Sequence, residues 1–161
     1  MGHLLVLSIL VPLLAFLATL TWQNKNERQI GMIVRLAKVL NIALALLFAV
    51  WWMAGGFVAV DYQLLTLYKT DHFVFALHFF YDEITAVFHI TGVILFFLVA
   101  TFSKYYMHRD PGYKRFFNTI LLFSTAYNLI ILSGNFETLF IGWEIKGICS
   151  FLLIAFYRDR Y

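Results

Sequence analysis

The sequence is poor in charge, in cysteine and in proline. Charged residues make up 13% of the 161 positions, there are two prolines, and Cys149 is the one cysteine. A single cysteine excludes an internal disulfide and a cysteine-based metal cage. Soluble domains carry about 25% charged residues, so a chain with so few cannot cover its own surface in water. The scarcity of charge argues against a soluble enzyme, a disordered chain and a nucleic-acid-binding protein.

Apolar residues fill the sequence instead, at 62% of all positions, and 19% of the positions are aromatic. A bilayer core requires about 20 apolar residues in a helix. Helices are favoured over strands because strand-like alternation is absent over most of this length and an isolated span must satisfy its own backbone groups. Five spans are predicted, at residues 4–22, 39–60, 84–102, 116–133 and 136–157. We therefore expect an all-α integral membrane protein with residues 1–161 in a single membrane domain.

The first span is interpreted as a membrane helix and not as a signal peptide. The residues before it, Met1-Gly2-His3, contain no Lys or Arg, and no small-residue cleavage site follows the apolar stretch. The span is therefore retained in the expected architecture.

The positions of the twelve Lys and Arg residues predict the orientation. Ten of them fall in three segments that alternate onto one side of the membrane, whereas Lys69 lies in a loop on the other side and Lys146 lies inside a span. By the positive-inside rule, the N-terminus is expected outside and the C-terminus inside. The ten are Lys25, Arg28, Arg35, Lys38, Lys104, Arg109, Lys114, Arg115, Arg158 and Arg160.

The connections between the predicted spans differ in length. The outer segment of residues 61–82 is long, and its part from His72 to His78 is predicted to form a short strand or hairpin on the outer surface. Gly134-Asn135 predicts a tight turn, which would make the fourth and fifth spans antiparallel neighbours.

Two ionisable residues fall near the centre of the fifth span, Glu144 and Lys146. Each ionised group at this depth costs roughly 2.5–3.5 kcal/mol, which makes such a residue a functional candidate. A carboxyl group lowers this cost by binding a proton, and this is the chemistry of a proton relay. Two helical residues apart means roughly 200° of rotation, so a direct pair between them is not expected. Lys146 is also open to two structural readings, snorkelling or a pair across a helix interface.

Weaker candidates for proton transfer are Glu137 and His89. Glu137 lies seven residues before Glu144 on the same helix face, where it either belongs to an access route or marks a solvated helix end. His89 lies about two turns into the third span, and histidine transfers protons near neutral pH. A lone histidine on an apolar helix equally suits a structural hydrogen bond.

The other polar residues in the spans have structural interpretations. Asp82 and Glu83 are expected to cap the third span, where acids complement the helix dipole. Asn128 and Ser124 share one face of the fourth span, as residues that hydrogen-bond between helices do. The sequence contains no phosphate-binding loop, nucleophile–base pair or ligand cluster. We expect no catalytic centre, cofactor or metal in this chain.

Several motifs resemble one family. Gly142-Trp143-Glu144, followed by Ser150-Phe151-Leu152-Leu153-Ile154, is fairly specific to it; the others are Asp82, Tyr105-Tyr106-Met107 and Arg115-Phe116-Phe117. Together they resemble the N-terminal part of the antiporter-like subunits of complex I, of the subunit-5 or bacterial L type. The superfamily includes multisubunit cation/proton antiporters and membrane subunits of inorganic-carbon-accumulating complexes. The resemblance covers nearly the whole chain and is tightest over residues 82–157.

The resemblance implies a role for Glu144. In this family the matching glutamate is the first key residue of the proton channel, and it partners a lysine on a broken helix two spans later. That helix and the second inverted repeat are not in this sequence, so a partner chain is expected to supply them. Two positions depart from the family pattern: Lys146 stands where an apolar or small residue is usual, and Glu83 where glycine is common.

The expected function is that of a membrane subunit in a proton-translocating, or sodium-translocating, complex. Two settings remain open: a complex I-like NADH:quinone oxidoreductase, and inorganic-carbon uptake in which proton flux drives CO₂ hydration at a zinc-bearing partner. The alternatives are a structural or assembly subunit without transport and, less well supported, a membrane anchor for a soluble enzyme. The expected partners are other membrane subunits and the lipid bilayer. The expected location is the bacterial cytoplasmic membrane, with the mitochondrial inner membrane as the alternative.

Overall fold

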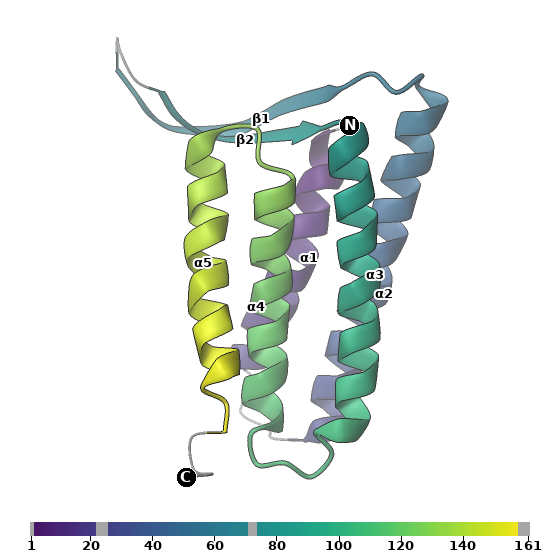
Figure 1. The fold of residues 1–161 in the computed structure, drawn as a ribbon, viewed down its shortest axis with the longest axis vertical. Helices are drawn as coiled ribbons and strands as arrows, with labels where there is room; N and C mark the ends of the chain where they lie inside the picture. The colour runs from purple at the N-terminus through teal and green to yellow at the C-terminus, as the bar shows by residue number, and fades with distance from the viewer. Residues whose placement is uncertain (1, 22–25, 71–73, 158–161) are drawn as a thin grey trace.

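The computed structural model describes residues 2–21, 26–70 and 74–157, which form five helices and one β-hairpin. Figure 1 shows the helices standing side by side along the long axis, with the hairpin lying across one end. The mostly helical prediction is confirmed, and the hairpin is the part that departs from an all-α fold. In chain order, the elements are α1 (Gly2–Thr21), α2 (Glu27–Ala54), β1 (Val60–Lys69), β2 (Val74–Tyr81), α3 (Glu83–Tyr106), α4 (Tyr113–Ile131) and α5 (Phe136–Ile154).

The helices alternate in direction, so each end of the molecule collects its own connections. The hairpin, the N-terminus and the α4–α5 turn lie at one end, which we call the hairpin end (Figure 1). The α3–α4 loop and the end of α5 lie at the other, which we call the loop end. Helices α1 to α4 pack around a shared core, whereas α5 packs along α4 and against β2. One flank of α5 is therefore left uncovered by the described part of the chain.

The core consists of two apolar clusters, one toward each end. The cluster at the loop end includes Ile30, Val34 and Phe117, and the cluster at the hairpin end is built around Phe48 and Tyr81. Phe48 and Trp52 meet the Tyr81 ring edge-on at 4.7 and 5.4 Å between centroids. Burial raises the pKa of the Tyr81 phenol to about 12. The hairpin is thus sealed onto the helices by an aromatic contact at its base.

Three of the described helices, α1, α2 and α3, are long and apolar enough to cross a membrane. Each of the other two has 19 residues and is about 28 Å long, close to the thickness of a bilayer core. Charged residues set these two helices apart, because α4 begins with Lys114 and Arg115 and α5 carries Glu137, Glu144 and Lys146. Length and composition alone therefore qualify three helices, and the crossing of the membrane by α4 and α5 stays a prediction.

Helix α2 begins well before its predicted start at residue 39. Asn26 caps it, and its side-chain oxygen accepts a hydrogen bond from the Arg28 N–H at 3.0 Å. A buried stripe then continues without a break through the part that was interpreted as a loop. The stripe contains Ile30, Val34, Ala37, Asn41, Ala45 and Phe48. Three of the cations assigned to an inner loop, Arg28, Arg35 and Lys38, therefore lie on the helix, and Lys38 is buried within it, while Lys25 lies outside the described residues.

Helix α2 also ends earlier than predicted, at Ala54 instead of residue 60. Gly55 and Gly56 follow it, and Gly56 has φ +81°, a left-handed conformation that glycine adopts at little cost. The chain then turns into β1 at Val60. The predicted end was wrong because the apolar sequence continues beyond Gly55 and Gly56, whereas the helical backbone conformation ends at them.

The hairpin is longer than the segment predicted from His72 to His78. Its strands of ten and eight residues pair antiparallel, from Val60 opposite Tyr81 to Lys69 opposite Val74. Two register shifts in β1 mark bulges. His78 lies within β2, and His72 lies outside the described residues. The hairpin was underestimated because β1 mixes polar and apolar residues, whereas β2 is apolar except for His78, so the two strands share no common pattern.

Helix α3 begins at a cap, as predicted. The Asp82 carboxylate accepts a hydrogen bond from the Thr85 N–H at 2.8 Å, and this bond lowers the pKa of Asp82. We expect Asp82→Ala to lower the free energy of unfolding by about 1 kcal/mol, whereas Asp82→Asn keeps an acceptor and most of the stability. Thermal unfolding of the purified chain in detergent, followed by circular dichroism, measures both. Equal losses in the two variants would contradict the capping role.

Candidate functional site

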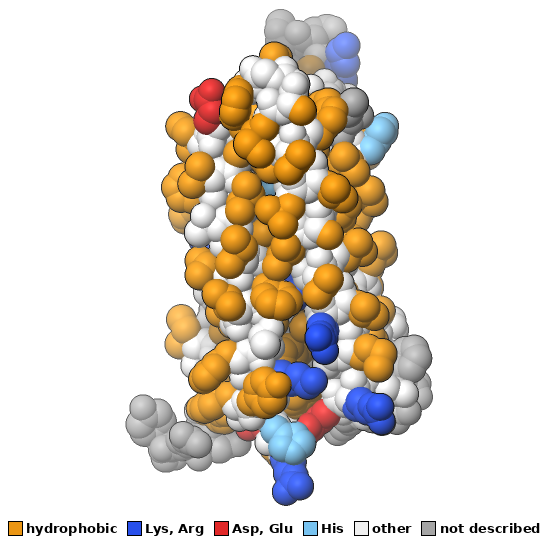
Figure 2. Space-filling model, turned by 90° about the vertical axis from the view of Figure 1, so that its right-hand side faces the viewer, with side chains coloured by type: hydrophobic (Ala, Val, Ile, Leu, Met, Phe, Trp, Pro, Cys, Tyr) orange, Lys and Arg blue, Asp and Glu red, His pale blue; other side chains and the backbone are white. Residues whose placement is uncertain are grey.

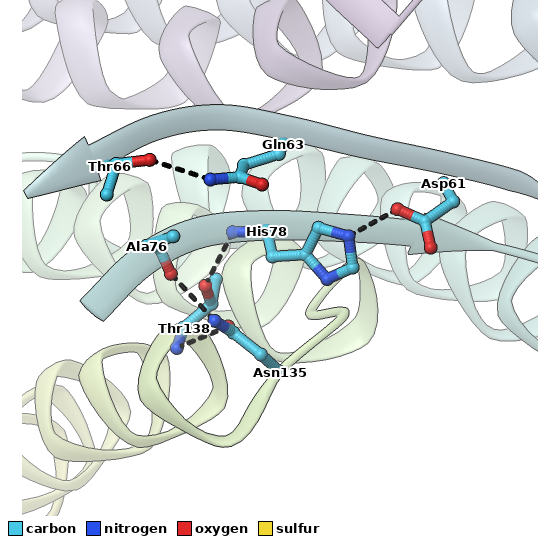
Figure 3. A network of polar contacts seen from close by, with 7 residues as sticks. All are labelled: Asp61, Gln63, Thr66, Ala76, His78, Asn135 and Thr138. Carbon is cyan, nitrogen blue, oxygen red and sulfur yellow. Dashed lines mark hydrogen bonds and ion pairs between the residues drawn. The ribbon is translucent and has the colours of Figure 1, made fainter. Parts of the chain in front are cut away.

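The start of α5 is fixed by hydrogen bonds from the hairpin (Figure 3). The His78 backbone N–H donates to Thr138 Oγ1 at 3.0 Å, and the Asn135 side-chain amide donates to the Ala76 carbonyl at 2.7 Å. Asn135 also caps α5, because its side-chain oxygen accepts from the Thr138 N–H at 3.0 Å. The side chains of His78 and Asp61 pair across the two strands (Figure 3). Strand β2 therefore sets where α5 begins.

The turn between α4 and α5 is as tight as the sequence predicted. The Gly134 N–H donates to the His78 carbonyl at 2.8 Å, and the Phe80 N–H donates to the Leu132 carbonyl at 2.9 Å. A Cβ atom at Gly134 would lie 2.5 Å from the His78 ring, so the turn has no room for a side chain. The prediction that these helices are antiparallel neighbours is confirmed.

Helix α5 packs on α4 through small residues. Thr138, Gly142 and Cys149 are its buried residues, and their spacing places them along one face. A Cβ atom at Gly142 would lie 3.0 Å from the backbone nitrogen of Ile130. The two helices therefore approach each other most closely at the glycine of the Gly-Trp-Glu motif.

The loop end of α5 is also held to α4. The Arg115 guanidinium donates to the carbonyl of Phe156 at 2.9 Å and lies 4.8 Å from the centroid of that ring. Phe156 follows the last helical residue of α5 and is buried in the cluster at the loop end. Both ends of α5 are thus attached to the rest of the chain.

Glu144 lies on the side of α5 that faces away from α4. It follows Gly142 by two residues, a rotation of roughly 200°, and its side chain is exposed. Its neighbours on this flank are Phe140, Ile148 and Phe151, exposed by 53%, 58% and 69%. Across the described ranges of the chain, no hydrogen bond or ion pair involves its carboxylate. Glu144 is also next to the middle residue of the helix, so the acid sits at the centre of an uncovered apolar surface.

Lys146 occupies a different side of α5 and is half-buried. Its ammonium lies 5.9 Å from the centroid of the Trp143 ring. No ion pair joins it to Glu144, as the angular offset between the two residues predicts. Lys146 borders a shallow pocket with Trp143, Gly147 and Ser150, at the edge of the uncovered flank.

The other two predicted candidates lie elsewhere. Glu137 is half-buried in the first turn of α5, where an acid complements the helix dipole. His89 is fully buried on α3 inside the bundle of α1 to α4, with its ring 6.2 Å from that of Tyr81. Neither ring nitrogen has a hydrogen-bond partner among the described protein atoms. The structure does not bring these residues together with Glu144.

Buried polar residues join the helices of the bundle near its centre. The side-chain amides of Asn41 and Asn128 both donate to the Ser8 carbonyl at 2.7 Å, which links α1, α2 and α4. The predicted interhelical role of Asn128 is confirmed, and Ser124 on the same face is buried. Asn41 was not singled out from the sequence. Its signal in the sequence is its place seven residues from both Val34 and Phe48, on the apolar stripe of α2.

Sequence reasoning also missed Lys38. Its side chain is 3% exposed, its Nζ atom has no hydrogen-bond partner in the described structure, and it lies 4.6 Å from the centroid of the Phe96 ring. A signal was present, because Lys38 follows Val34 by four residues and precedes Asn41 by three, on the stripe that faces the core.

Comparison with known proteins identifies the family. Residues 67–117 match the family described as NADH-ubiquinone oxidoreductase (complex I), chain 5 N-terminus. NADH-quinone oxidoreductase subunit L of Neisseria meningitidis Z2491 is 34% identical over 155 residues, which cover 94% of this chain and 23% of that protein. The subunit L of Escherichia coli K12 is 30% identical over 158 residues, which cover 96% and 25%.

A eukaryotic relative shows the same likeness. NADH-ubiquinone oxidoreductase chain 5 of Metridium senile is 41% identical over 101 residues, which cover 63% of this chain and 16% of that protein. The chain spans about a quarter of the length of the bacterial relatives that it matches. With its apolar helices and its match over nearly the whole chain, this integral membrane protein belongs to the antiporter-like subunit family of complex I.

Proposed function

We propose that this chain is a membrane subunit of a proton-translocating, antiporter-like complex and that Glu144 is its protonatable station. The observation that carries the proposal is the position of Glu144, at the middle of α5 on a flank that no described element covers. An ionised carboxylate facing lipid costs roughly 2.5–3.5 kcal/mol, so such a flank calls for a second helix that brings a counter-charge or water. A Glu144 carboxyl group that exchanges a proton with a residue or water at that helix avoids the cost of a charge facing lipid.

All five helices cross the membrane in this proposal, with the hairpin end outside and the loop end inside. The alternating helix directions support this arrangement (Figure 1), as does the distribution of cations. Arg28, Lys104 and Arg115 lie toward the loop end, whereas Lys69 lies on the hairpin. Helix α4 tolerates its polar residues because α1, α3 and α5 surround it. Helix α5 requires a partner for the same purpose.

A partner chain supplies the missing cover on α5. In the family, the glutamate pairs with a lysine on a later helix. The uncovered flank of α5 is where such a helix would dock. Lys146 borders this flank and would face the same partner. Glu137 lies at the hairpin end of α5, on the outer approach to Glu144. His89 stays inside the bundle and has no place in this path.

The relatives are named as subunits of NADH-quinone oxidoreductases, which supports a complex I-like setting. Inorganic-carbon uptake is the second setting within the same superfamily. Purification of the complex through a tag on this chain, with its subunits identified by mass spectrometry, separates the two settings. Flavin and iron–sulfur subunits select the first, and a large zinc-binding subunit selects the second.

The proposal is tested by measuring proton movement. The purified complex is reconstituted into vesicles that contain a pH-sensitive dye, and its substrate reaction is started from outside. We expect a change of internal pH that depends on turnover and collapses when a protonophore is added. Turnover with no pH change would contradict translocation and favour a structural subunit.

A further inference from the structure

A pocket opens between α2, α3 and the start of α4 near the loop end, and its charged lining is entirely cationic. Arg35 and Lys38 enter it from α2, and Lys104 enters it from α3. No acidic residue is among the described residues that line it. Figure 2 shows Lys and Arg side chains gathered over the lower part of this face, beneath a largely apolar surface. We call this site the basic pocket.

The acids nearest in sequence to these cations, Glu27 and Asp110, are engaged elsewhere, and the Asp110 carboxylate accepts a hydrogen bond from the Gly112 N–H at 2.6 Å. Glu27, at the start of α2, accepts hydrogen bonds from His108 Nδ1 and from the Arg109 backbone N–H, both at 2.9 Å. No ion pair is formed by Arg35, Lys38 or Lys104 within the described residues. The basic pocket is therefore left with uncompensated positive charge.

The burial of Lys38 makes the positive charge of the basic pocket energetically unfavourable. It is 3% exposed and its Nζ atom has no hydrogen-bond partner in the described part of the chain. The ring of Phe96, 4.6 Å away, offers a cation–π contact but no acceptor of a hydrogen bond. A buried cation is stable only when a counter-charge or hydrogen bonds compensate for its lost hydration. The basic pocket thus has the composition of an anion-binding site whose deepest group is an ammonium.

The rest of the lining indicates which kind of anion fits. Val34, Phe97 and Phe117 form apolar walls. Leu36 and Phe102, the chain neighbours of the lining residues Arg35 and Thr101, are exposed by 63% and 71%. A free phosphate ion gains nothing from such walls, whereas the acyl chains of a lipid would lie along them. The two helices that form most of the pocket are also among those apolar enough to cross a membrane.

We propose that the basic pocket binds the phosphate headgroup of an anionic phospholipid, with Lys38 as its deepest contact and Arg35 and Lys104 at its mouth. Cationic pockets between membrane helices on the cytoplasmic side are built for such headgroups. The proposal does not depend on Glu144, because the basic pocket lies on the opposite side of the bundle from α5. The site would fasten α2 and α3 to the inner leaflet.

The test uses the purified full chain in uncharged detergent. Phosphatidylglycerol, phosphatidylcholine with the same acyl chains, and inorganic phosphate are added separately. Native mass spectrometry reports how many lipids are retained, and thermal unfolding reports stabilisation. We expect one phosphatidylglycerol to be retained and to raise the unfolding temperature, with no effect of the other two. Equal effects of the two lipids would overturn the proposal, and stabilisation by inorganic phosphate that also displaces the lipid would assign the site to a soluble anion.

Variants locate the binding. The double variant Arg35→Gln/Lys104→Gln removes two exposed cations and is expected to weaken phosphatidylglycerol binding about 30-fold. Arg28→Gln, a matched loss of charge on the same helix but outside the basic pocket, is expected to leave binding unchanged. Lys38→Met is expected to unfold at a higher temperature without lipid and to lose the preference for phosphatidylglycerol. Equal weakening by Arg28→Gln, or full preference in Lys38→Met, would overturn the assignment.

Discussion

Replacing Glu144 by glutamine is expected to leave the complex assembled and to reduce its proton translocation by about 100-fold or more. The amide has nearly the size of the carboxyl group, so the uncovered flank of α5 still fits its partner. It cannot bind and release a proton at neutral pH, so the station is lost. The initial rate of internal pH change in reconstituted vesicles measures translocation, and co-purification of the subunits measures assembly.

Glu83→Gln serves as the matched control. Glu83 is an exposed acid in the first turn of α3, and the variant loses the same charge at the hairpin end of the bundle. Its proton translocation should equal that of the unmodified complex. If Glu144→Gln retains translocation as fully as Glu83→Gln, the chain is a structural subunit and Glu144 is not a proton station.

A Gly142→Leu variant is expected to lose about 3 kcal/mol of stability, or about 6–12 °C in unfolding temperature. The added Cβ atom would lie 3.0 Å from the backbone nitrogen of Ile130, which cannot move without displacing α4. The remaining side-chain atoms would push α5 farther away. Thermal unfolding of the purified chain in detergent measures the loss.

Gly147→Leu is the control for this substitution, because it lies on the same helix and no atom lies within 4 Å of its added Cβ. Leucine has the higher helix propensity, so this variant is expected to be slightly more stable than the unmodified chain. The difference between the two variants therefore isolates the α4–α5 contact. Equal stability of the two variants would mean that close approach at Gly142 is not required.

The helices could be predicted because long apolar runs leave few other structures in a membrane, but their ends required local signals. The caps at Asn26 and Asn135 and the glycines at 55 and 56 set boundaries that average hydropathy does not register. The extent of the hairpin could not be predicted, because its strands are stabilised by pairing with each other and by contacts with the α4–α5 turn. Such contacts join residues far apart in the chain.

The candidate site was predictable to a different degree. Glu144 stands out in the sequence because charges are rare in apolar spans, and its orientation away from α4 follows from its spacing to Gly142. Lys38 could not be recognised in the same way, because it was counted among the cations of a loop that proved to be helical. The residues that would contact Glu144 could not be predicted from this sequence, because no described element of the chain covers the exposed flank of α5.

The attachment of α5 at both ends limits how the proposed station can work. At one end, hydrogen bonds to β2 hold Asn135 and Thr138, and at the other end Arg115 holds Phe156. Turning the helix about its axis would break both attachments and drive Gly142 out of its contact with α4. These attachments argue against alternating access through rotation of α5. Under the proposed function, protons would then reach a stationary Glu144 carboxylate from each side in turn, and the gating would be provided by water and the proposed partner helix.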